Sequence, residues 1–168
     1  MISGMNRLKK LQLTVTTLLI LIASFCWADD AYKAKVIGIS DGDTIKVLHN
    51  DQLVRVRLYG IDTPEKRQAF GNKAKQYTAR KVFQKTVLLI PKDTDRYGRT
   101  VAVVQIPGER SSLNEALVAD GFAWVYRKYC KVGFCADWLN LEHEARSTGR
   151  GLWADPHRIP PWEYRKRK

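Results

Sequence analysis

The hydrophobic positions in the first two thirds of the chain predict short strands. In residues 53–58, positions 54, 56 and 58 are apolar and fall on one face of a strand, whereas Arg55 and Arg57 fall on the other. Arg57 is therefore expected to point away from the apolar row. Alternation, or a high content of Val and Ile, predicts strands at 33–39, 44–48, 53–58, 87–90 and 100–106.

Turn-forming residues separate these strands. Ser40–Asp43 favours a hairpin between the first two strands, and residues 49–51 form a second turn. A third turn is expected at 93–98, between the last two strands. The polar stretch 62–69 contains Pro64, so we interpret it as a loop.

Three helices are predicted from the helical spacing of apolar residues and from capping signals. The first covers residues 70–82 and has a basic outer face, because lysines and arginines lie between its apolar residues. The second begins at the capping box Ser112-Leu-Asn-Glu115 and ends before Gly121. The third runs from Asp137 to about Thr148. The basic end of the chain, Arg165–Lys168, is expected to be disordered.

The order of these elements predicts an α+β fold. Five strands with one helix between the third and the fourth, then further helices, are typical of a small barrel of the oligonucleotide-binding type. Element order alone also allows other α+β folds. A chain of 168 residues, 45% of them hydrophobic, is long enough for one ordinary core. We therefore expect a five-stranded antiparallel β-barrel with three α-helices, forming one domain with tails.

The first 28 residues have the order of a secretory signal peptide. Basic residues precede an apolar run, 11–25, which is followed by Cys26-Trp-Ala28 and two aspartates. Cleavage is expected near Ala28. One alternative is a membrane anchor, for which the run is shorter than the roughly 20 residues that a spanning helix needs. The other is a lipid anchor on Cys26. The favoured interpretation is an exported protein, periplasmic or secreted.

The chain is strongly basic. Its formal charge is +12, and about +9 remains after removal of residues 1–28, which contain Arg7, Lys9 and Lys10 and no acid. Such a field attracts polyanions, which fits nucleic acid and also an anionic membrane surface. Charge alone therefore leaves the chemistry open.

Two cysteines, Cys130 and Cys135, remain after the expected cleavage. An even number in an exported chain predicts a disulfide, which here would close a short loop. Half of a zinc site is the alternative, but no further His or Cys lies nearby at ligand spacing. We therefore expect a local, structural disulfide.

Three segments combine carboxylates with arginines. They are Asp41-Gly-Asp-Thr44, Arg57-Leu-Tyr-Gly-Ile-Asp62-Thr-Pro-Glu65 and Asp95-Arg-Tyr-Gly-Arg99. Carboxylates supply the hard oxygens that hold a divalent cation, and arginines bind phosphate through paired donors. Together the segments predict a metal-dependent phosphodiesterase.

With Leu113-Asn-Glu-Ala-Leu117, these segments resemble the staphylococcal nuclease, or thermonuclease, family, in the same order over about residues 33–153. The resemblance implies a five-stranded barrel with three helices and calcium-dependent hydrolysis of DNA and RNA. It implies that Asp43 and Asp62 are carboxylate ligands of Ca²⁺, with the backbone carbonyl of Thr63 as a third ligand. Asp41 would support the site, more through water than directly. Another divalent ion in place of calcium stays open.

The same resemblance implies the catalytic residues. Arg57 and Arg99 match the arginines that bind the scissile phosphate, where such donors favour the transition state as charge develops. Glu65 matches the general base, and whether it accepts a proton from water or orients the water stays open. The implied reaction is in-line attack of water with departure of the 5′ oxygen, which leaves a 3′-phosphate end.

Substrate contacts are implied less directly. Arg96 stands where the staphylococcal enzyme has lysine, and Tyr97 beside it matches the family sequence. Tyr126 and Tyr129 lie in about the region of two substrate-contacting tyrosines of the family, although the cysteine segment after them changes the spacing. Either ring could stack on a base.

Three functions of different classes fit these observations. The first is an exported nuclease with little sequence preference, with DNA and RNA as its partners, acting as a monomer without stable membrane association. Its domain would cover residues 33–155, followed by a basic tail, 156–168. The second is a nucleic-acid-binding module without catalysis. Such a module would need the lysine and arginine side chains but not the carboxylates. The third is a basic membrane-surface protein, which only the charge and the tail support. The retained carboxylates favour the nuclease.

Overall fold

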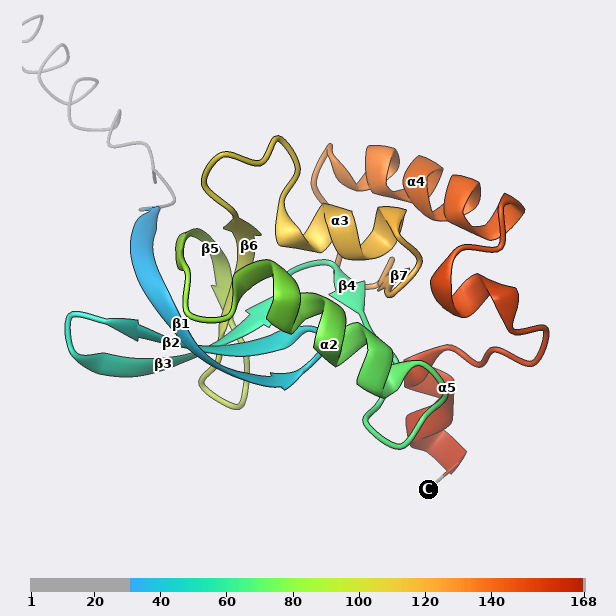
Figure 1. Cartoon of the computed structure of the whole chain (residues 1–168), viewed down its shortest axis with the longest axis horizontal. Helices are drawn as coiled ribbons and strands as arrows, with labels where there is room; N and C mark the ends of the chain where they lie inside the picture. Colours follow the sequence, from blue (N-terminus) through green and yellow to red (C-terminus); the bar gives the residue numbers. More distant parts are fainter. Residues whose placement is uncertain (1–30, 168) are drawn as a thin grey trace, which may run out of the picture. The chain divides into compact units, whose positions relative to one another are not determined.

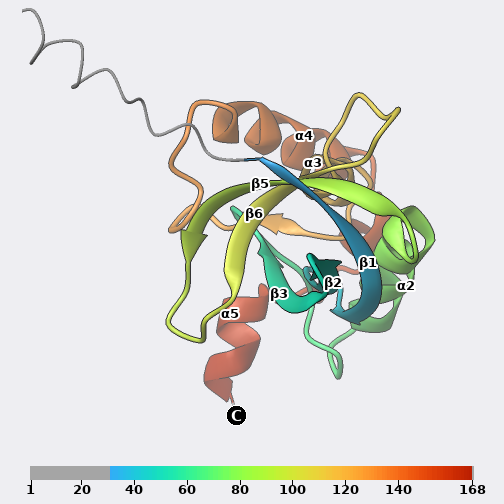
Figure 2. The same cartoon turned by 90° about the vertical axis from the view of Figure 1, so that its left-hand side faces the viewer.

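The computed structural model describes residues 31–167, which contain a closed five-stranded barrel (Figures 1 and 2). The predicted signal peptide, residues 1–28, lies outside the described residues. Among the residues that are described, no helix has the length and apolar character that crossing a membrane requires. In the barrel, neighbouring strands follow the order β1-β2-β3-β6-β5. Their bounds are β1 (Tyr32–Asp41), β2 (Thr44–His49), β3 (Gln52–Leu58), β5 (Thr86–Thr94) and β6 (Thr100–Gln105).

The barrel is mixed, so the prediction of an antiparallel barrel is wrong in one strand pair. Strands β3 and β6 run parallel, with Arg57 opposite Val101, whereas the other neighbours in the barrel are antiparallel. The reason is geometric, because a closed ring with an odd number of strands cannot reverse direction at every step. The parallel pair places Arg57 beside the start of β6, immediately after Arg99.

The inward faces of the strands form one hydrophobic core. In β3, Val56 and Leu58 are buried and Arg55 is exposed, which confirms the predicted alternation. Each buried aliphatic side chain of this size contributes about 1.5–3 kcal/mol relative to an exposed one. The buried barrel residues are Ala34, Val36, Ile45, Val47, Val56, Leu58, Val87, Leu89, Ala102 and Val104. Because the inward positions are apolar, the polar site has to form at the turns and outer faces of the strands.

Four α-helices lie within residues 31–167, one more than predicted. They are α2 (Gly71–Val82), α3 (Leu113–Ala119), α4 (Cys135–Ser147) and α5 (Pro161–Tyr164). The capping signal of α3 is confirmed, because the Ser112 side chain accepts a hydrogen bond from the Glu115 amide at 3.1 Å. Helix α5 has four residues, too few to give a periodic hydrophobic signal, and it begins at a proline, which suits a first helical position.

The end of the chain is ordered against the domain, so the prediction of a disordered tail is wrong for its described residues. Two 3-10 helices, η1 (Gly151–Ala154) and η2 (Arg165–Arg167), flank α5 in the sequence. Trp162 of α5 packs against a buried cluster of Trp124, Ala145, Leu152 and Trp153. Burial of this indole offsets the entropy lost when the tail is ordered. Figure 1 shows α5 close to the loop that precedes α2.

Cys130 and Cys135 form a disulfide next to the turn between β3 and the short strand β4 (Ile61–Asp62). A Cβ atom added at Gly60, in that turn, would lie 2.7 Å from the Cys130 sulfur. Tyr59 beside it accepts a hydrogen bond from the Lys131 amide at 3.1 Å. The disulfide loop therefore packs directly against the segment that leads to Asp62.

Replacing both Cys130 and Cys135 with alanine is expected to lower the free energy of unfolding by about 2 kcal/mol, the loop-entropy value for so short a loop. Urea denaturation of the wild type and of the double variant measures the change. Reduction of the wild type should produce the same shift, whereas the double variant should not respond to reductant. Equal stability of oxidised wild type and double variant would contradict the prediction.

Candidate active site

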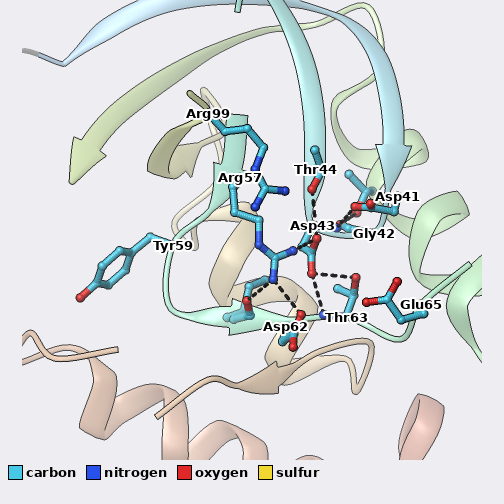
Figure 3. A network of polar contacts seen from close by, with 12 residues as sticks. Asp41, Gly42, Asp43, Thr44, Arg57, Tyr59, Asp62, Thr63, Glu65 and Arg99 are labelled. Carbon is cyan, nitrogen blue, oxygen red and sulfur yellow. Dashed lines mark hydrogen bonds and ion pairs between the residues drawn. The ribbon is translucent and has the colours of Figure 1, made fainter. Parts of the chain in front are cut away.

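The candidate site forms where the turn between β1 and β2 meets the end of β3, β4 and the loop that follows it (Figure 3). Gly42 in that turn lies so close to the loop that an added Cβ would be 2.7 Å from the Thr63 hydroxyl and 2.8 Å from the Ala74 methyl. The Thr78 hydroxyl of α2 donates to the Gly42 carbonyl at 2.5 Å. Helix α2 therefore fixes the turn that carries Asp43.

Asp43 is a buried carboxylate whose two oxygens are both engaged. Its side chain Oδ2 accepts from the amide of Thr63 at 2.7 Å and from the Thr63 hydroxyl at 2.9 Å. Oδ1 accepts from the Thr44 hydroxyl at 3.2 Å and pairs with Arg57. With 3% of the residue exposed, such a charge is tolerated because hydrogen bonds and a counter-charge surround it.

Asp62 is the second buried carboxylate, with 1% of the residue exposed. It lies in β4, which pairs with β7 (Trp124–Val125), where Asp62 is opposite Trp124. Its Oδ1 accepts from Arg57 at 2.7 Å, and its Oδ2 accepts from Arg165 at 2.7 Å. Two guanidinium groups therefore compensate one buried charge.

Arg57 joins the two carboxylates. Its Nη1 pairs with Asp43, and its Nη2 donates to Asp62 and, at 3.1 Å, to the Ile61 carbonyl. Burial lowers the pKa of the Arg57 guanidinium, the ion pair with Asp62 opposes this shift, and the nearby charge of Arg99 adds to it. An arginine remains protonated at any relevant pH. The predicted metal-binding carboxylates and a predicted phosphate-binding arginine are thus brought together, as Figure 3 shows.

Glu65 lies in the loop between β4 and α2, close to Thr63 in Figure 3. The Glu65 amide donates to the Gln68 side chain at 3.1 Å, and the Gln68 amide donates back to the Glu65 carbonyl at 2.8 Å. Gly71 is required by this loop, because a Cβ there would collide with the Glu65 carbonyl. The loop therefore has little freedom at Glu65, and its side chain faces the site.

Arg165 is a site residue that the sequence did not indicate. Its Nη1 donates to Glu65 at 2.6 Å, and its two Nη groups both reach Asp62. Partial burial lowers the pKa of the Arg165 guanidinium, but the hydrogen bonds to Asp62 and Glu65 outweigh this effect and raise the pKa. Four consecutive basic residues at a chain end give no signal that would single out this one.

Arg99 is held by the turn between β5 and β6. Its Nε donates to Asp95 at 2.7 Å, and Asp95 also accepts from the amides of Arg99 and Tyr97. Desolvation raises the pKa of Asp95, but these hydrogen bonds outweigh it and hold the pKa below its usual value. At a pH above the usual pKa of an aspartate, ionised Asp95 thus stabilises the turn. This contribution is lost as pH falls through the lowered pKa of Asp95. Figure 3 shows the guanidinium of Arg99 beside that of Arg57.

Replacing Asp95 with asparagine is expected to reduce the predicted phosphodiester cleavage about 5- to 10-fold, because the turn keeps an acceptor but Arg99 loses its charged partner. Initial cleavage rates of Asp95→Asn and of Arg99→Ala, which should lose far more, measure the effect. Asp93→Asn on the same hairpin serves as the control. An unchanged rate in Asp95→Asn would show that Arg99 is positioned without it.

Asp41, at the end of β1, accepts a hydrogen bond from the Asp43 amide at 3.3 Å. Its charge also favours the protonated form of Arg57. The structure therefore places Asp41 beside the buried Asp43, where it supports the turn.

The four predicted substrate residues lie outside this cluster. Tyr97 is 57% exposed on the turn of Arg99, and its hydroxyl accepts from Arg96 at 2.6 Å. Tyr126 stacks on Trp162 of the C-terminal segment, with the ring centroids 5.0 Å apart and the planes at 9°. Tyr129 lies edge-on to Tyr126 and is 54% exposed. One face of Tyr126 is therefore covered, whereas Tyr97 and Tyr129 are accessible.

The donor set of this cluster fits a hard divalent cation. The carboxylates of Asp43 and Asp62 converge on one positive group, and the third predicted ligand is the carbonyl of Thr63, so the set consists of oxygens alone. Within residues 31–167, no group of three or more His, Cys, Asp or Glu side chains is arranged to hold a metal. Two carboxylates and a backbone carbonyl do not amount to such a group. In this structure both carboxylates are paired with guanidinium groups, so the fit to a cation rests on the oxygen chemistry of the predicted ligands.

Comparison with known proteins places the chain among nuclease relatives. Residues 55–155 match the family described as staphylococcal nuclease homologue, a range that contains Arg57, Asp62, Glu65 and Arg99. The chain is 41% identical over 168 residues to a micrococcal nuclease of Shigella flexneri, covering 96% of this chain and 95% of that protein. It is 47% identical over 156 residues to protein ParB of Escherichia coli, covering 88% and 85%. It is 37% identical over 161 residues to an uncharacterized endonuclease of Haemophilus influenzae, covering 95% and 87%.

Proposed function

We propose that this chain, which belongs to the staphylococcal nuclease family, is an exported, calcium-dependent nuclease that cleaves DNA and RNA and leaves 3′-phosphate ends. Family membership and the nuclease and endonuclease relatives make it a phosphodiester hydrolase. The proposed calcium site and phosphate binding rest above all on one observation, the guanidinium of Arg57 between the buried carboxylates of Asp43 and Asp62. That arrangement combines a cation site with a phosphate-binding group.

In this proposal, Asp43, Asp62 and the carbonyl of Thr63 hold Ca²⁺, and Asp41 supports them through water. Calcium prefers several oxygen ligands in a loosely defined shell, which two carboxylates and a carbonyl can begin to supply. The bound ion would neutralise part of the charge of the attacked phosphate.

Arg57 and Arg99 would bind the phosphate. Their guanidinium groups lie side by side, the charge of Arg99 disfavours that of Arg57, and an anion between them would relieve that repulsion. Hydrogen bonds to the phosphate oxygens grow stronger as negative charge develops on them. Loss of one such donor costs about 3–4 kcal/mol in comparable sites.

Glu65 would take a proton from the attacking water. Its carboxylate lies in the loop directly after the predicted metal ligands, and its backbone is held by Gln68 and by the tight approach of Gly71. Water that loses its proton to Glu65 would attack phosphorus in line with the 5′ oxygen; the bond from phosphorus to that oxygen breaks, and the oxygen leaves as a hydroxyl after taking up a proton from solvent. The phosphate stays on the 3′ side of the break.

Digestion of circular single-stranded DNA and of RNA by the purified protein tests this proposal. Cleavage with calcium, and little with magnesium or with a chelator, is the expected pattern. The new 3′ ends should block extension by a polymerase until a phosphatase has removed the phosphate. Tight binding without cleavage in any metal would overturn the proposal and favour a binding module.

Export is proposed from the composition of residues 1–28. Protein recovered from the periplasm or the medium should begin near Asp29, which N-terminal sequencing measures. A full-length chain retained in the cytoplasm would contradict export and leave the nuclease proposal untouched.

A further inference from the structure

The C-terminal segment reaches the candidate active site through Arg165. One Nη of Arg165 lies 2.6 Å from the Glu65 carboxylate, and the other lies 2.7 Å from Asp62. These two acids are the ones to which the proposed function assigns proton transfer and metal binding. A single guanidinium therefore engages both groups at once, across about 100 residues of sequence.

The position of Arg165 is fixed by the residues before it. Trp162 stacks on Tyr126 and lies edge-on to Trp124, with ring centroids 6.5 Å apart. Tyr164 donates to the Arg67 carbonyl at 3.2 Å, and the Gln68 side chain donates to the carbonyl of Ile159. The segment thus binds the same loop that carries Glu65. The contact of Arg165 is therefore a docked arrangement and not the chance position of a long side chain.

This docking is incompatible with the proposed chemistry at both acids. Arg165 Nη2 occupies one carboxylate oxygen of Asp62, and Arg57 occupies the other. A cation that binds Asp62 has to compete with these hydrogen bonds. Arg165 also occupies one carboxylate oxygen of Glu65, which is then not available to a water molecule. The stacked Trp162 also covers one face of the Tyr126 ring, which was predicted to contact substrate. One segment therefore engages two acids of the site and covers one face of a tyrosine outside it.

We propose that the C-terminal segment, residues 156–167, is an intramolecular latch that competes with calcium for Asp62 and holds Glu65 inactive until calcium displaces Arg165. The inference rests on the proposed function, because it takes Asp62 as a calcium ligand. Competition for one carboxylate is reciprocal. Docking of the segment weakens calcium binding by a certain factor, and calcium weakens docking by the same factor. The side chain of Arg165 is 42% exposed, so water screens its ion pairs and the factor should be moderate.

Calorimetric titration of the full chain with calcium alone tests the latch, because it needs no substrate and no cleavage. Arg165→Ala should bind calcium about 3- to 10-fold more tightly than the wild type. Arg167→Ala is the matched control, since it removes the same charge from an exposed neighbour in η2, and its affinity should stay within about twofold. Arg165→Lys, which keeps the charge but loses the planar fork, should lie between the wild type and Arg165→Ala.

Cleavage rates provide the second readout. At subsaturating calcium, Arg165→Ala should cleave faster than the wild type, and at saturating calcium the two rates should agree. A large loss of cleavage at saturating calcium, with calcium affinity unchanged, would overturn the latch and make Arg165 a phosphate-binding residue.

The calcium titration separates failure of the latch from failure of the proposed function. Equal calcium affinity in all four proteins would overturn the latch while leaving the calcium-dependent nuclease in place. Absence of calcium binding in the wild type and in every variant would overturn both. Calcium binding by Arg165→Ala but not by the wild type would support the latch and show that docking of the segment prevents calcium binding.

Discussion

Replacing Arg57 with alanine is expected to destabilise the calcium-free protein by about 3–5 kcal/mol, the cost of removing one partner from a buried ion pair. Asp43 and Asp62 are both almost fully buried and both pair with this guanidinium. Arg165 would still compensate Asp62, but Asp43 would keep only hydrogen bonds from Thr63 and Thr44 among the described contacts. Urea denaturation in the presence of a chelator measures the loss.

Calcium at the site proposed to include Asp43 and Asp62 should restore much of this stability, because its charge would replace the missing one and it would bind the folded state alone. Cleavage should not recover. Without the guanidinium of Arg57, the transition state loses donors worth about 3–4 kcal/mol, which corresponds to a rate lower by about 10²- to 10³-fold. Stability and activity would thus respond differently to calcium in the same variant.

Arg55→Ala is the matched control for Arg57→Ala. Arg55 lies on the same strand, is exposed, and donates to the Tyr97 carbonyl at 2.9 Å. Its removal should cost less than about 1 kcal/mol, as for most exposed positions. If Arg57→Ala in chelator is as stable as the wild type, the two buried carboxylates do not depend on the Arg57 guanidinium.

Much of the barrel could be predicted from the sequence because strand periodicity reflects burial directly. The alternation in β3 placed Val56 inward and Arg57 outward, and the structure agrees. The parallel pairing of β3 and β6 carries no local signal, since it follows from closing a ring of five strands. Local patterns thus describe each strand, whereas its partner is decided by the closure of the whole sheet.

The candidate site could be assembled from the sequence only in part. Asp43, Arg57, Asp62 and Glu65 lie in short segments with a characteristic order, so a family resemblance was enough to group them. The place of Arg165 in the site could not be predicted in this way. Its contact with Glu65 depends on how Trp162 packs, and a basic chain end more often remains solvated. A long-range contact of this kind has no sequence pattern of its own.

Replacing Glu65 with glutamine is expected to lower the cleavage rate by about 10²- to 10⁴-fold if the side chain accepts the proton of the attacking water. Glutamine has the same size and can still accept a hydrogen bond through its amide oxygen, but it cannot take up a proton. The Glu65 side chain is 34% exposed and pairs with Arg165, so the folded state should lose less than about 1 kcal/mol. Single-turnover cleavage rates at saturating calcium measure the effect on chemistry.

Glu65→Ala and Glu109→Gln complete this comparison and distinguish the two roles left open for Glu65. Glu109, which pairs with Lys81 away from the site, controls for the loss of one negative charge, and its variant should cleave at the wild-type rate. Equal, large losses in Glu65→Gln and Glu65→Ala would identify Glu65 as the proton acceptor. A nearly active Glu65→Gln beside an inactive Glu65→Ala would show instead that Glu65 orients the water by a hydrogen bond, because only the glutamine retains an acceptor.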